Sequence, residues 1–232
     1  MLLLAFETSA KAGSVALMEN GVLLAENYQN TGLTHSQTLL SMAEAMLCHS
    51  GRTAQDVQAV AVAAGPGSFT GVRIGVAAAK GFAWGAQLPC YGVSTLEAMA
   101  RSLGLWQGVI CCVMDARRQQ VYNALFRVEA GNLTRLTEDR AISLEDLGKE
   151  LKLFEETIFL VGDGSNLCYN TLQEHIQTLA LPQEHRIHQR ASGVALAAQA
   201  KIDAGETGDA ASLEPNYLRL SQAERERLEK EK

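Results

Sequence analysis

A glycine-rich loop holds the residues whose types and spacing most suit a binding site. Residues 65–71 read Gly-Pro-Gly-Ser-Phe-Thr-Gly and lie between an apolar segment and a helical pattern. Such a loop often binds phosphate, because free backbone N–H groups and the helix dipole favour an anion. The loop lacks the Lys-Ser/Thr pair of a Walker loop, and its third glycine falls one residue late for a dinucleotide fingerprint. Two hypotheses therefore stay open, a phosphate site and a tight structural turn, for the loop residues Gly65, Gly67, Ser68 and Gly71.

Acidic residues form the second set of candidates. Glu7 and Asp115 each end an apolar segment and precede a polar turn, and a Gly-Asp-Gly loop occupies residues 162–164. In a nucleotide-dependent enzyme, Glu7 could hold a metal, Asp115 could act in catalysis, and the loop with Gly162 and Gly164 could contact the adenosine. That loop fits a plain strand–helix turn equally well.

Metal-ligand spacing is missing from the sequence. No CxxC or HxxxH pair occurs, and His185 with His188 forms a lone HxxH in a polar segment. Structural and catalytic zinc sites normally use three or four protein ligands. The five cysteines are odd in number and have no framework spacing, which is typical of reduced thiols in a cytosol. We therefore expect a cytoplasmic protein without a metal site.

Composition limits the possible partners. The chain has 232 residues, is 47% apolar and carries a net charge of −6. Its lysines and arginines are scattered, which indicates weak affinity for RNA, because RNA is held largely through its phosphates. No apolar run is long enough to span a membrane. Residues 221–232 carry eight charges and are predicted to form a solvated tail.

The candidate residues lie on two copies of one structural unit. Residues 2–28 predict a strand, an acid, a turn and a two-stranded hairpin, and residues 109–138 repeat this order. The hairpins are expected at Asn20-Gly21 and Gly131-Asn132. Helix–strand–helix segments follow each triplet, and those of the second copy are shorter. Two duplicated βββαβα units predict an actin-like, sugar-kinase-like α/β fold, with subdomains at residues 1–105 and 106–220. The last helix could pack back on the first subdomain.

Two helices of the first copy carry more apolar surface than one core needs. Residues 36–49 place five residues on one broad apolar face: Leu39, Leu40, Ala43, Met46 and Leu47. Residues 70–85 carry only two charges, Arg73 and Lys80, and small residues recur there, such as Gly75, Gly81 and Gly85. A glycine inside a helix costs roughly 1 kcal/mol relative to alanine, so several together indicate close packing. Packing within the protomer and a protein interface both explain this pattern.

Several motifs, in order along nearly the whole chain, resemble the TsaB family. They are GPGSFTGVRIG at residues 65–75, GVSTL at 92–96, DARR at 115–118 with VY at 121–122, and PNYLR at 215–219. The resemblance implies an actin-like fold and membership of the complex that forms threonylcarbamoyladenosine next to the anticodon of tRNA. In that family the partner is a larger catalytic paralogue, TsaD, which carries the metal. An ATPase, TsaE, joins the two.

The resemblance also implies a non-catalytic role. TsaD has an HxxxH metal motif whose histidines align with Thr95 and Met99 here, and the first turn lacks glycine until Gly13. We therefore expect a scaffold or activating subunit without catalytic residues or a cofactor, although weak nucleotide binding at the partner interface stays open. The family's partner helices correspond to residues 36–49 and 70–85, which include Arg73, Gly75 and Lys80.

The expected partners follow from this role. They are a TsaD-like paralogue, a TsaE-like ATPase, tRNA through the complex, and a second copy when the chain is alone. Two other functions stay open. An ATP-dependent phosphotransferase of the same fold would use Glu7, Asp115 and residues 162–164. A metalloprotease is disfavoured by the missing ligand pair.

Overall fold

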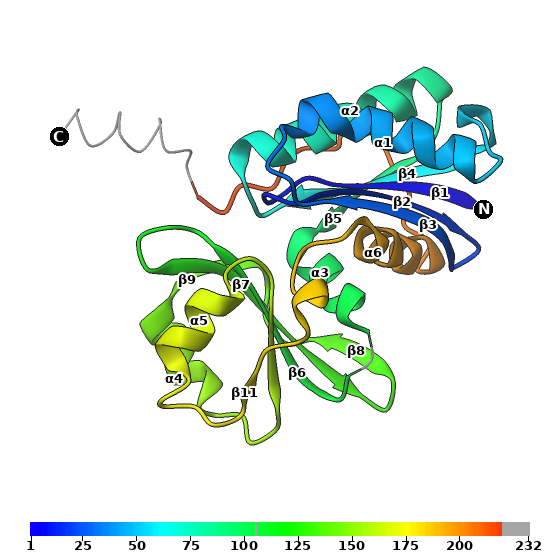
Figure 1. Cartoon of the computed structure of the whole chain (residues 1–232). Helices are drawn as coiled ribbons and strands as arrows, with labels where there is room; N and C mark the ends of the chain where they lie inside the picture. The colour runs from blue at the N-terminus through cyan, green and yellow to red at the C-terminus, as the bar shows by residue number, and fades with distance from the viewer. Residues whose placement is uncertain (105, 220–232) are drawn as a thin grey trace.

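A computed structural model describes residues 1–104 and 106–219 of the chain, which form two lobes with one sheet in each (Figure 1). The first half of the chain contains β1 (Leu2–Glu7), β2 (Gly13–Glu19), β3 (Val22–Gln29), α1 (His35–His49), β4 (Ala59–Gly65), α2 (Phe69–Ala86), β5 (Cys90–Ser94) and α3 (Thr95–Leu103). The second half contains β6 (Gly108–Asp115), β7 (Gln120–Glu129), β8 (Asn132–Arg135), β9 (Arg140–Ser143), α4 (Leu144–Leu151), β10 (Ile158–Val161), α5 (Ser165–Leu172), β11 (Leu179–Ala180) and α6 (Ala191–Asp203). Two short 3-10 turns lie at Ala54–Asp56 and Glu184–Arg186.

The two sheets have the same strand order, which confirms the predicted duplicated actin-like fold. The first sheet runs β3-β2-β1-β4-β5, and the second runs β8-β7-β6-β10-β11 when it is written from the equivalent edge. The second copy is reduced: α5 has 8 residues where α2 has 18, and β11 has 2 where β5 has 5. Each copy therefore places its strand–acid–turn element at the same position in its sheet.

Three details of the second copy differ from the sequence prediction. Helix α5 ends at Leu172 and not at residue 179, because Leu179 pairs as β11 with Ile158. The short strand β9, which the sequence analysis missed, pairs with the first residues of β7. The positive φ angles of the hairpin belong to Ala130 (49°) and Gly131 (81°), so the turn lies one residue earlier than predicted.

Helices cover both faces of each sheet. Helices α1 and α2 pack on one face of the first sheet, and α6 packs on the other. Helix α3 packs on the inner face of the second sheet, and α4 and α5 cover its outer face. Because both faces are covered, β1 and β6 are continuous apolar runs rather than alternating ones. The adjacent Cys111 and Cys112 of β6 point into these two different cores, where they fill space.

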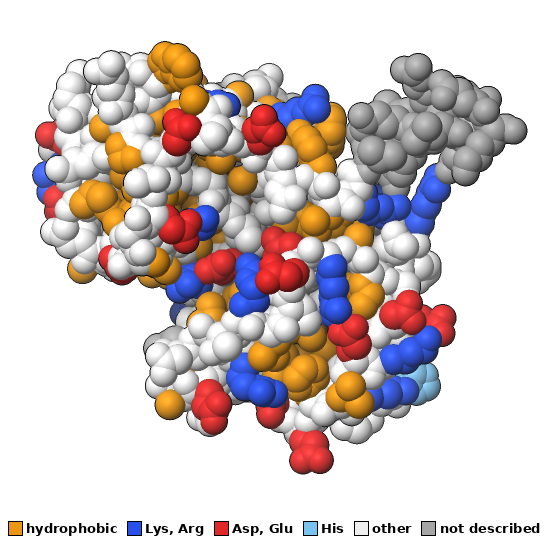
Figure 2. Space-filling view, turned by 180° about the vertical axis from the view of Figure 1, so that it is seen from behind, with side chains coloured by type: hydrophobic (Ala, Val, Ile, Leu, Met, Phe, Trp, Pro, Cys, Tyr) orange, Lys and Arg blue, Asp and Glu red, His pale blue; other side chains and the backbone are white. Residues whose placement is uncertain are grey.

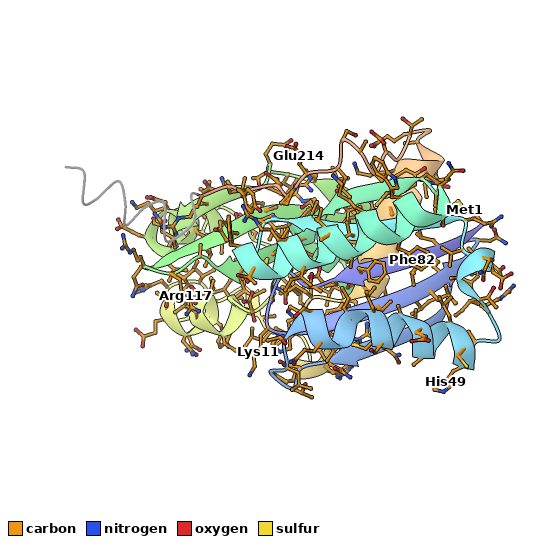
Figure 3. The ribbon with its side chains drawn as sticks, turned by 90° about the horizontal axis from the view of Figure 1, so that it is seen from above. Met1, Lys11, His49, Phe82, Arg117 and Glu214 are labelled. Atoms are coloured by element: carbon orange, nitrogen blue, oxygen red, sulfur yellow. The ribbon has the colours of Figure 1, made fainter. Side chains whose placement is uncertain are left out.

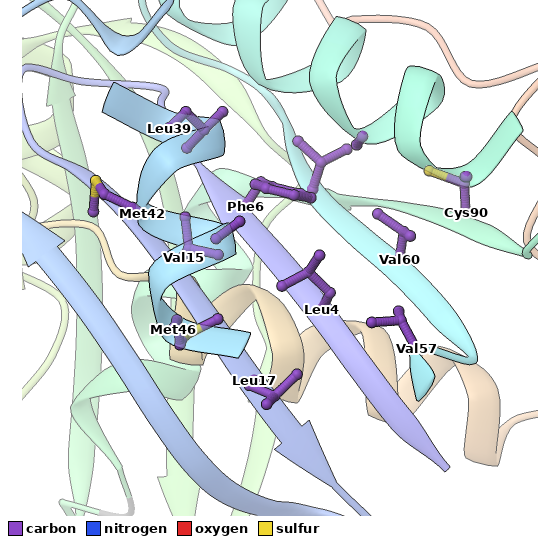
Figure 4. Close-up of a cluster of buried hydrophobic side chains, with 14 of the residues drawn as sticks. Leu4, Phe6, Val15, Leu17, Leu39, Met42, Met46, Val57, Val60 and Cys90 are labelled. Atoms are coloured by element: carbon purple, nitrogen blue, oxygen red, sulfur yellow. The ribbon is translucent and has the colours of Figure 1, made fainter. Parts of the chain in front are cut away.

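The core under α1 and α2 explains why these helices form where they do. Leu4 and Phe6 of β1 share one buried cluster with Met42 and Met46 of α1 (Figure 4). The alternate residue Leu3 points the other way, toward α6, because successive strand residues face opposite sides. The first sheet is thus tied to the end of the chain as well as to its own helices.

A C-terminal strap, defined here as residues 205–219, follows α6 and runs back across the molecule. It passes beside β5 and α2 and ends at the junction of the two lobes. The charged tail predicted at residues 221–232 lies outside the described residues. Among the residues that are described, no helix is long and apolar enough to cross a lipid bilayer.

Candidate functional site

A cleft of about 460 Å³ separates the two lobes at the ends of β1 and β6. Four segments line it: the β1–β2 turn, the glycine-rich loop, the β6–β7 turn and the end of the strap. The lining residues are Ser9, Ala10, Lys11, Pro66, Gly67, Ser68, Phe69, Met114, Asp115, Ala116, Arg117, Tyr122, Asp163, Asn216, Tyr217, Leu218 and Arg219. Of the equivalent acids of the two copies, Asp115 lines this cleft, whereas Glu7 is buried beneath the β1–β2 turn that borders it.

The glycine-rich loop packs backbone against backbone. A Cβ on Gly67 would lie 2.6 Å from the carbonyl oxygen of Ser9, and one on Gly65 would lie 2.5 Å from that of Asn216. The Ser68 N–H donates to the Ser9 carbonyl at 2.7 Å, and the Ser68 hydroxyl caps α2 by accepting from Gly71 N–H at 3.3 Å. These contacts account for the loop as a tight structural turn. The phosphate role stays a prediction.

Glu7 is buried beneath the β1–β2 turn, with 1% of its surface exposed. Its Oε1 accepts from the Ser9 N–H at 2.5 Å, whereas its Oε2 has no hydrogen-bond partner among the described residues. Burial raises the pKa of Glu7 to about 7, and the negative charge of Asp163 adds to the rise. At neutral pH the carboxyl is therefore divided between its charged and neutral forms.

Asp115 organises the β6–β7 turn. Its Oδ1 accepts from the Arg117 N–H at 2.7 Å, and its Oδ2 lies 3.4 Å from the Arg117 guanidinium. Arg117, Arg118 and Gln119 have φ angles of 65°, 55° and 60°. This left-handed backbone costs roughly 1 kcal/mol or more per non-glycine residue, so the turn must be held by its surroundings. One such contact is the bond from Leu144 N–H to the Gln119 carbonyl at 3.1 Å.

The Gly-Asp-Gly loop joins β10 to α5. A Cβ on Gly162, where φ is 107°, would lie 2.1 Å from the Val113 carbonyl oxygen, and one on Gly164 would lie 3.1 Å from Asp115 N. Both glycines are thus explained by close packing on β6. Asp163 reaches the cleft, where desolvation raises its pKa while its Oδ1 accepts from Gln189 Nε2 at 3.0 Å. The nucleotide role of Gly162 and Gly164 stays a prediction.

The structure corrects most of the residues chosen as partner contacts on α1. Leu39, Ala43, Met46 and Leu47 are at most 5% exposed and pack in the core of this chain. These side chains face the first sheet, because the core beneath the helix buries the continuous apolar face of α1. Leu40 points outward and is 57% exposed.

The candidates on α2 are also engaged within the chain. Gly75 lies against Thr8, whose Oγ1 would be 2.3 Å from an added Cβ. Lys80 Nζ donates to two strap carbonyls, those of Ala211 at 3.2 Å and Leu213 at 2.9 Å. Arg73 remains exposed but binds the strap too, as described below. Arg73 and Lys80 of α2 therefore both hold the strap by hydrogen bonds.

The free surface of this helix pair lies elsewhere. Gly81 and Gly85 have open space where a Cβ would be, and Trp84 between them is 68% exposed. Viewed from above, Phe82 lies between α1 and α2 (Figure 3). The sequence analysis noted the two glycines but missed Trp84, although a tryptophan among small residues is a usable signal for an interface.

The cleft also gathers basic residues that the sequence analysis described as scattered. Lys11, Arg117 and Arg219 line it from three separate segments. Lys11 and Arg117 follow the equivalent strands β1 and β6 and lie at the same end of the molecule (Figure 3). The predicted duplication was the signal that could have shown that Lys11 and Arg117 occupy equivalent positions.

Comparison with known proteins gives consistent matches. The family model described as TsaD, tRNA N6-adenosine threonylcarbamoyltransferase, matches residues 29–227. The tRNA threonylcarbamoyladenosine biosynthesis protein TsaB of Bacillus subtilis is 32% identical over 233 residues, which cover 100% of both proteins. The Escherichia coli protein of the same name is 38% identical over 144 residues, 61% of this chain and 62% of that protein.

Solved structures agree. One from Pseudomonas aeruginosa, an uncharacterized protein with similarity to peptidase YEAZ, matches with a TM-score of 0.77 and 27% identity over 94% of this chain and 99% of that one. The Clostridium difficile activator of 2-hydroxyisocaproyl-CoA dehydratase, which was solved with ADPNP bound, has a TM-score of 0.51 at 11% identity. It covers 88% of this chain and 97% of its own, and it shares the fold alone.

Proposed function

Because the chain belongs to the TsaB family, we propose that it is a non-catalytic subunit of the machinery that makes threonylcarbamoyladenosine in tRNA. In this proposal it activates a TsaD-like catalytic paralogue by pairing with it through α1 and α2. A TsaE-like ATPase joins the pair, tRNA is reached through the complex, and the isolated chain forms homodimers through the same surface.

The observation that carries the pairing proposal is the free face of α2. Among the described residues, no atom lies within 4 Å of a Cβ added at Gly81 or Gly85, so nothing in this part of the chain requires glycine there. Two glycines destabilise a helix by roughly 2 kcal/mol relative to alanine. Glycine permits another helix to approach closely, and the exposed Trp84 and Leu40 supply apolar area to bury.

The positions of the paralogue's metal ligands support a non-catalytic role. Thr95, the first residue of α3, is fully buried, and Met99 is 3% exposed in the core between α3 and β6. Neither side chain is a firm ligand for a hard or borderline metal ion. Within residues 1–104 and 106–219, no group of three His, Cys, Asp or Glu side chains is arranged to hold a metal.

A relative that is named as the transferase supports the paralogue relationship. The tRNA N6-adenosine threonylcarbamoyltransferase of Solidesulfovibrio magneticus is 31% identical over 65% of this chain but over only 42% of its own length. Much of that protein thus has no counterpart in the matched region. A chain that is similar to part of a transferase but lacks the pair of metal-binding histidines suits an activating role.

Reconstitution tests the proposal. The chain, the host's TsaD-like protein, or both together are supplied with tRNA, threonylcarbamoyl-adenylate and the TsaE-like ATPase, and the modified nucleoside is quantified. We expect product only when both proteins are present. Product from this chain without the paralogue, or undiminished product from the paralogue without this chain, would refute the proposal.

An ATP-dependent phosphotransferase remains the second candidate, because the interlobe cleft contains Asp115 and Asp163 and has Glu7 close beneath it. Calorimetric titration with Mg-ATP, followed by an assay for phosphate release, separates the two functions. Tight binding with turnover by the isolated chain would favour this candidate.

A further inference from the structure

The charges of this chain are distributed unevenly in a way that its net charge of −6 conceals. Away from the cleft, most arginines are paired with carboxylates, for example Arg52 with Glu19 at 2.9 Å and Arg127 with Glu156 at 2.8 Å. At the mouth of the cleft, Lys11 and Arg219 have no carboxylate partner among the described residues. Basic side chains gather at the base of the grey segment, where the lobes meet (Figure 2).

Aromatic rings accompany these cations. Tyr217 of the strap is 41% exposed and stacks on Phe69 of α2, with ring centroids 4.9 Å apart. The Arg73 guanidinium lies 3.8 Å from the centre of the Phe69 ring, and its Nε donates to the Tyr217 hydroxyl at 2.6 Å. Arg73 likewise has no carboxylate partner among the described residues. Cations beside the exposed Tyr217 ring suit RNA, because they neutralise phosphates while such a ring can stack on an unpaired base.

The backbone holds these cations at the rim of the cleft. The left-handed β6–β7 turn projects Arg117, whose side chain is 83% exposed although Asp115 lies 3.4 Å away. Arg219 is fixed from the other side, because its guanidinium donates to the Ala116 carbonyl of the same turn. Strained backbone that places a charge in solvent is commonly kept for a function.

The acidic residues of the cleft bear on whether a phosphate would bind at its rim or deeper inside. Asp163 lines the cleft and Glu7 is buried nearby with an unpartnered Oε2. An anion beside Asp163 would lie close to carboxyl groups, whereas an anion beside Lys11 and Arg219 would lie close to cations that have no carboxylate partner among the described residues. The charges therefore suit a phosphate backbone that crosses the mouth.

We propose that the cleft mouth, lined by Lys11, Arg117 and Arg219, binds the phosphate backbone of the RNA on which the complex acts. This inference rests on the proposed function, because the chain's own affinity for RNA is weak and the paralogue supplies the rest. Three phosphate contacts add to binding without defining sequence.

The test removes two cations from the rim and compares the result with a matched loss elsewhere. The rim variant is Lys11→Gln with Arg117→Gln. The control is Lys152→Gln with Arg186→Gln, which removes two exposed charges that do not line the cleft. Each variant is assembled with the TsaD-like paralogue, assembly is checked by sedimentation, and binding of an unmodified tRNA transcript is measured from 50 to 300 mM salt.

We expect the rim variant to bind tRNA about tenfold more weakly near 100 mM salt, with a slope of log K against log salt that is shallower by about 1.5. The control should match the wild-type complex. Equal affinity and equal slope for the rim variant would overturn the proposal. The proposal would also be overturned if the rim variant bound tRNA normally but bound Mg-ATP more weakly, because the cations would then bind a free nucleotide.

A parallel comparison keeps this result separate from the proposed function. Cross-linking of the isolated chain to the same transcript at low salt does not depend on the paralogue. Reduced cross-linking of the rim variant, but not of the control, supports the RNA surface even if assembly fails. If the double variant does not fold, Lys11→Gln alone carries the test, and unchanged cross-linking would overturn the proposal.

Discussion

The two halves of helix α2 use glycine for opposite reasons. In the first half, Gly71 and Gly75 lie against the β1–β2 turn, and a Cβ would come within 2.1 Å of the Thr8 carbonyl oxygen or 2.3 Å of the Thr8 hydroxyl. In the second half, Gly81 and Gly85 face open space. The same residue type, at similar spacing on one helix, thus has an internal cause at one end and none at the other.

This difference shows how a single repeated pattern can serve two surfaces. The first half of α2 packs inside the chain, because its glycines let the helix lie against the turn that follows Glu7. The second half reaches the outer surface beside Trp84. We infer that the cost of its glycines is offset by a partner and not by this fold.

The largest expected effect comes from closing the inner contact. Gly71→Ala would place a methyl group 2.1 Å from a backbone oxygen that cannot rotate away. We expect it to lower the free energy of unfolding by about 3 kcal/mol, as overpacking does in well-packed interiors. Chemical denaturation measures this loss. An unchanged midpoint would mean that the helix and the turn are not in contact as described.

The buried acid beneath the same turn gives the next effect. The pKa of Glu7 is raised from 4.5 to about 7, mainly by burial. The neutral carboxyl therefore contributes stability that is fully present below about pH 4.5 and is lost as the pH rises through about 7. Glu7→Gln keeps an acceptor for the Ser9 N–H and removes the charge. It should stabilise the chain by about 2 kcal/mol at pH 8 and have little effect at pH 4.5.

Thermal melts of this variant and the wild type across that pH range make the measurement. The exposed Glu44→Gln on α1 serves as the matched control, because it removes the same charge from the surface. A constant difference between Glu7→Gln and the wild type at all pH values would show that Glu7 does not titrate near neutrality.

The smallest effect has the opposite sign. Gly81→Ala fills open space and removes the helical cost of glycine, so we expect the isolated chain to gain up to about 1 kcal/mol. Denaturation curves set beside those of Gly71→Ala test the comparison directly. Destabilisation by Gly81→Ala would mean that the two halves of the helix do not differ.

The sequence predicted the fold well because its signals are local and repeated. The Asn20-Gly21 hairpin and the matching acids Glu7 and Asp115 appear where the pattern places them. The short β9 and β11 were missed because their pairing partners are distant in the sequence. Periodicity found the apolar face of α1, but it could not tell Leu39, which is buried, from Leu40, which is exposed.

The site was harder to predict, because its parts meet only in three dimensions. Nothing in the sequence indicates that Lys80 binds the Ala211 and Leu213 carbonyls, or that Arg73 donates to the Tyr217 hydroxyl. These contacts show that Arg73 and Lys80, which were expected at a partner interface, bind the strap of the same chain. A chain end that returns across the first lobe carries no periodic signal that would reveal it.

The central claim is that the outer half of α2 is a partner surface, and one binding measurement tests it most directly. Affinity for the host's TsaD-like paralogue is measured by sedimentation for the wild type, for Gly81→Glu and for Leu153→Glu, whose parent side chain is 81% exposed on the other lobe. We expect Gly81→Glu to weaken pairing about 30-fold or more, because a charge would be buried where helices should approach closely, while its melting curve stays close to that of the wild type. Leu153→Glu should pair normally. Unchanged affinity of Gly81→Glu would contradict the account, because the open glycines of α2 would then have no partner to explain them.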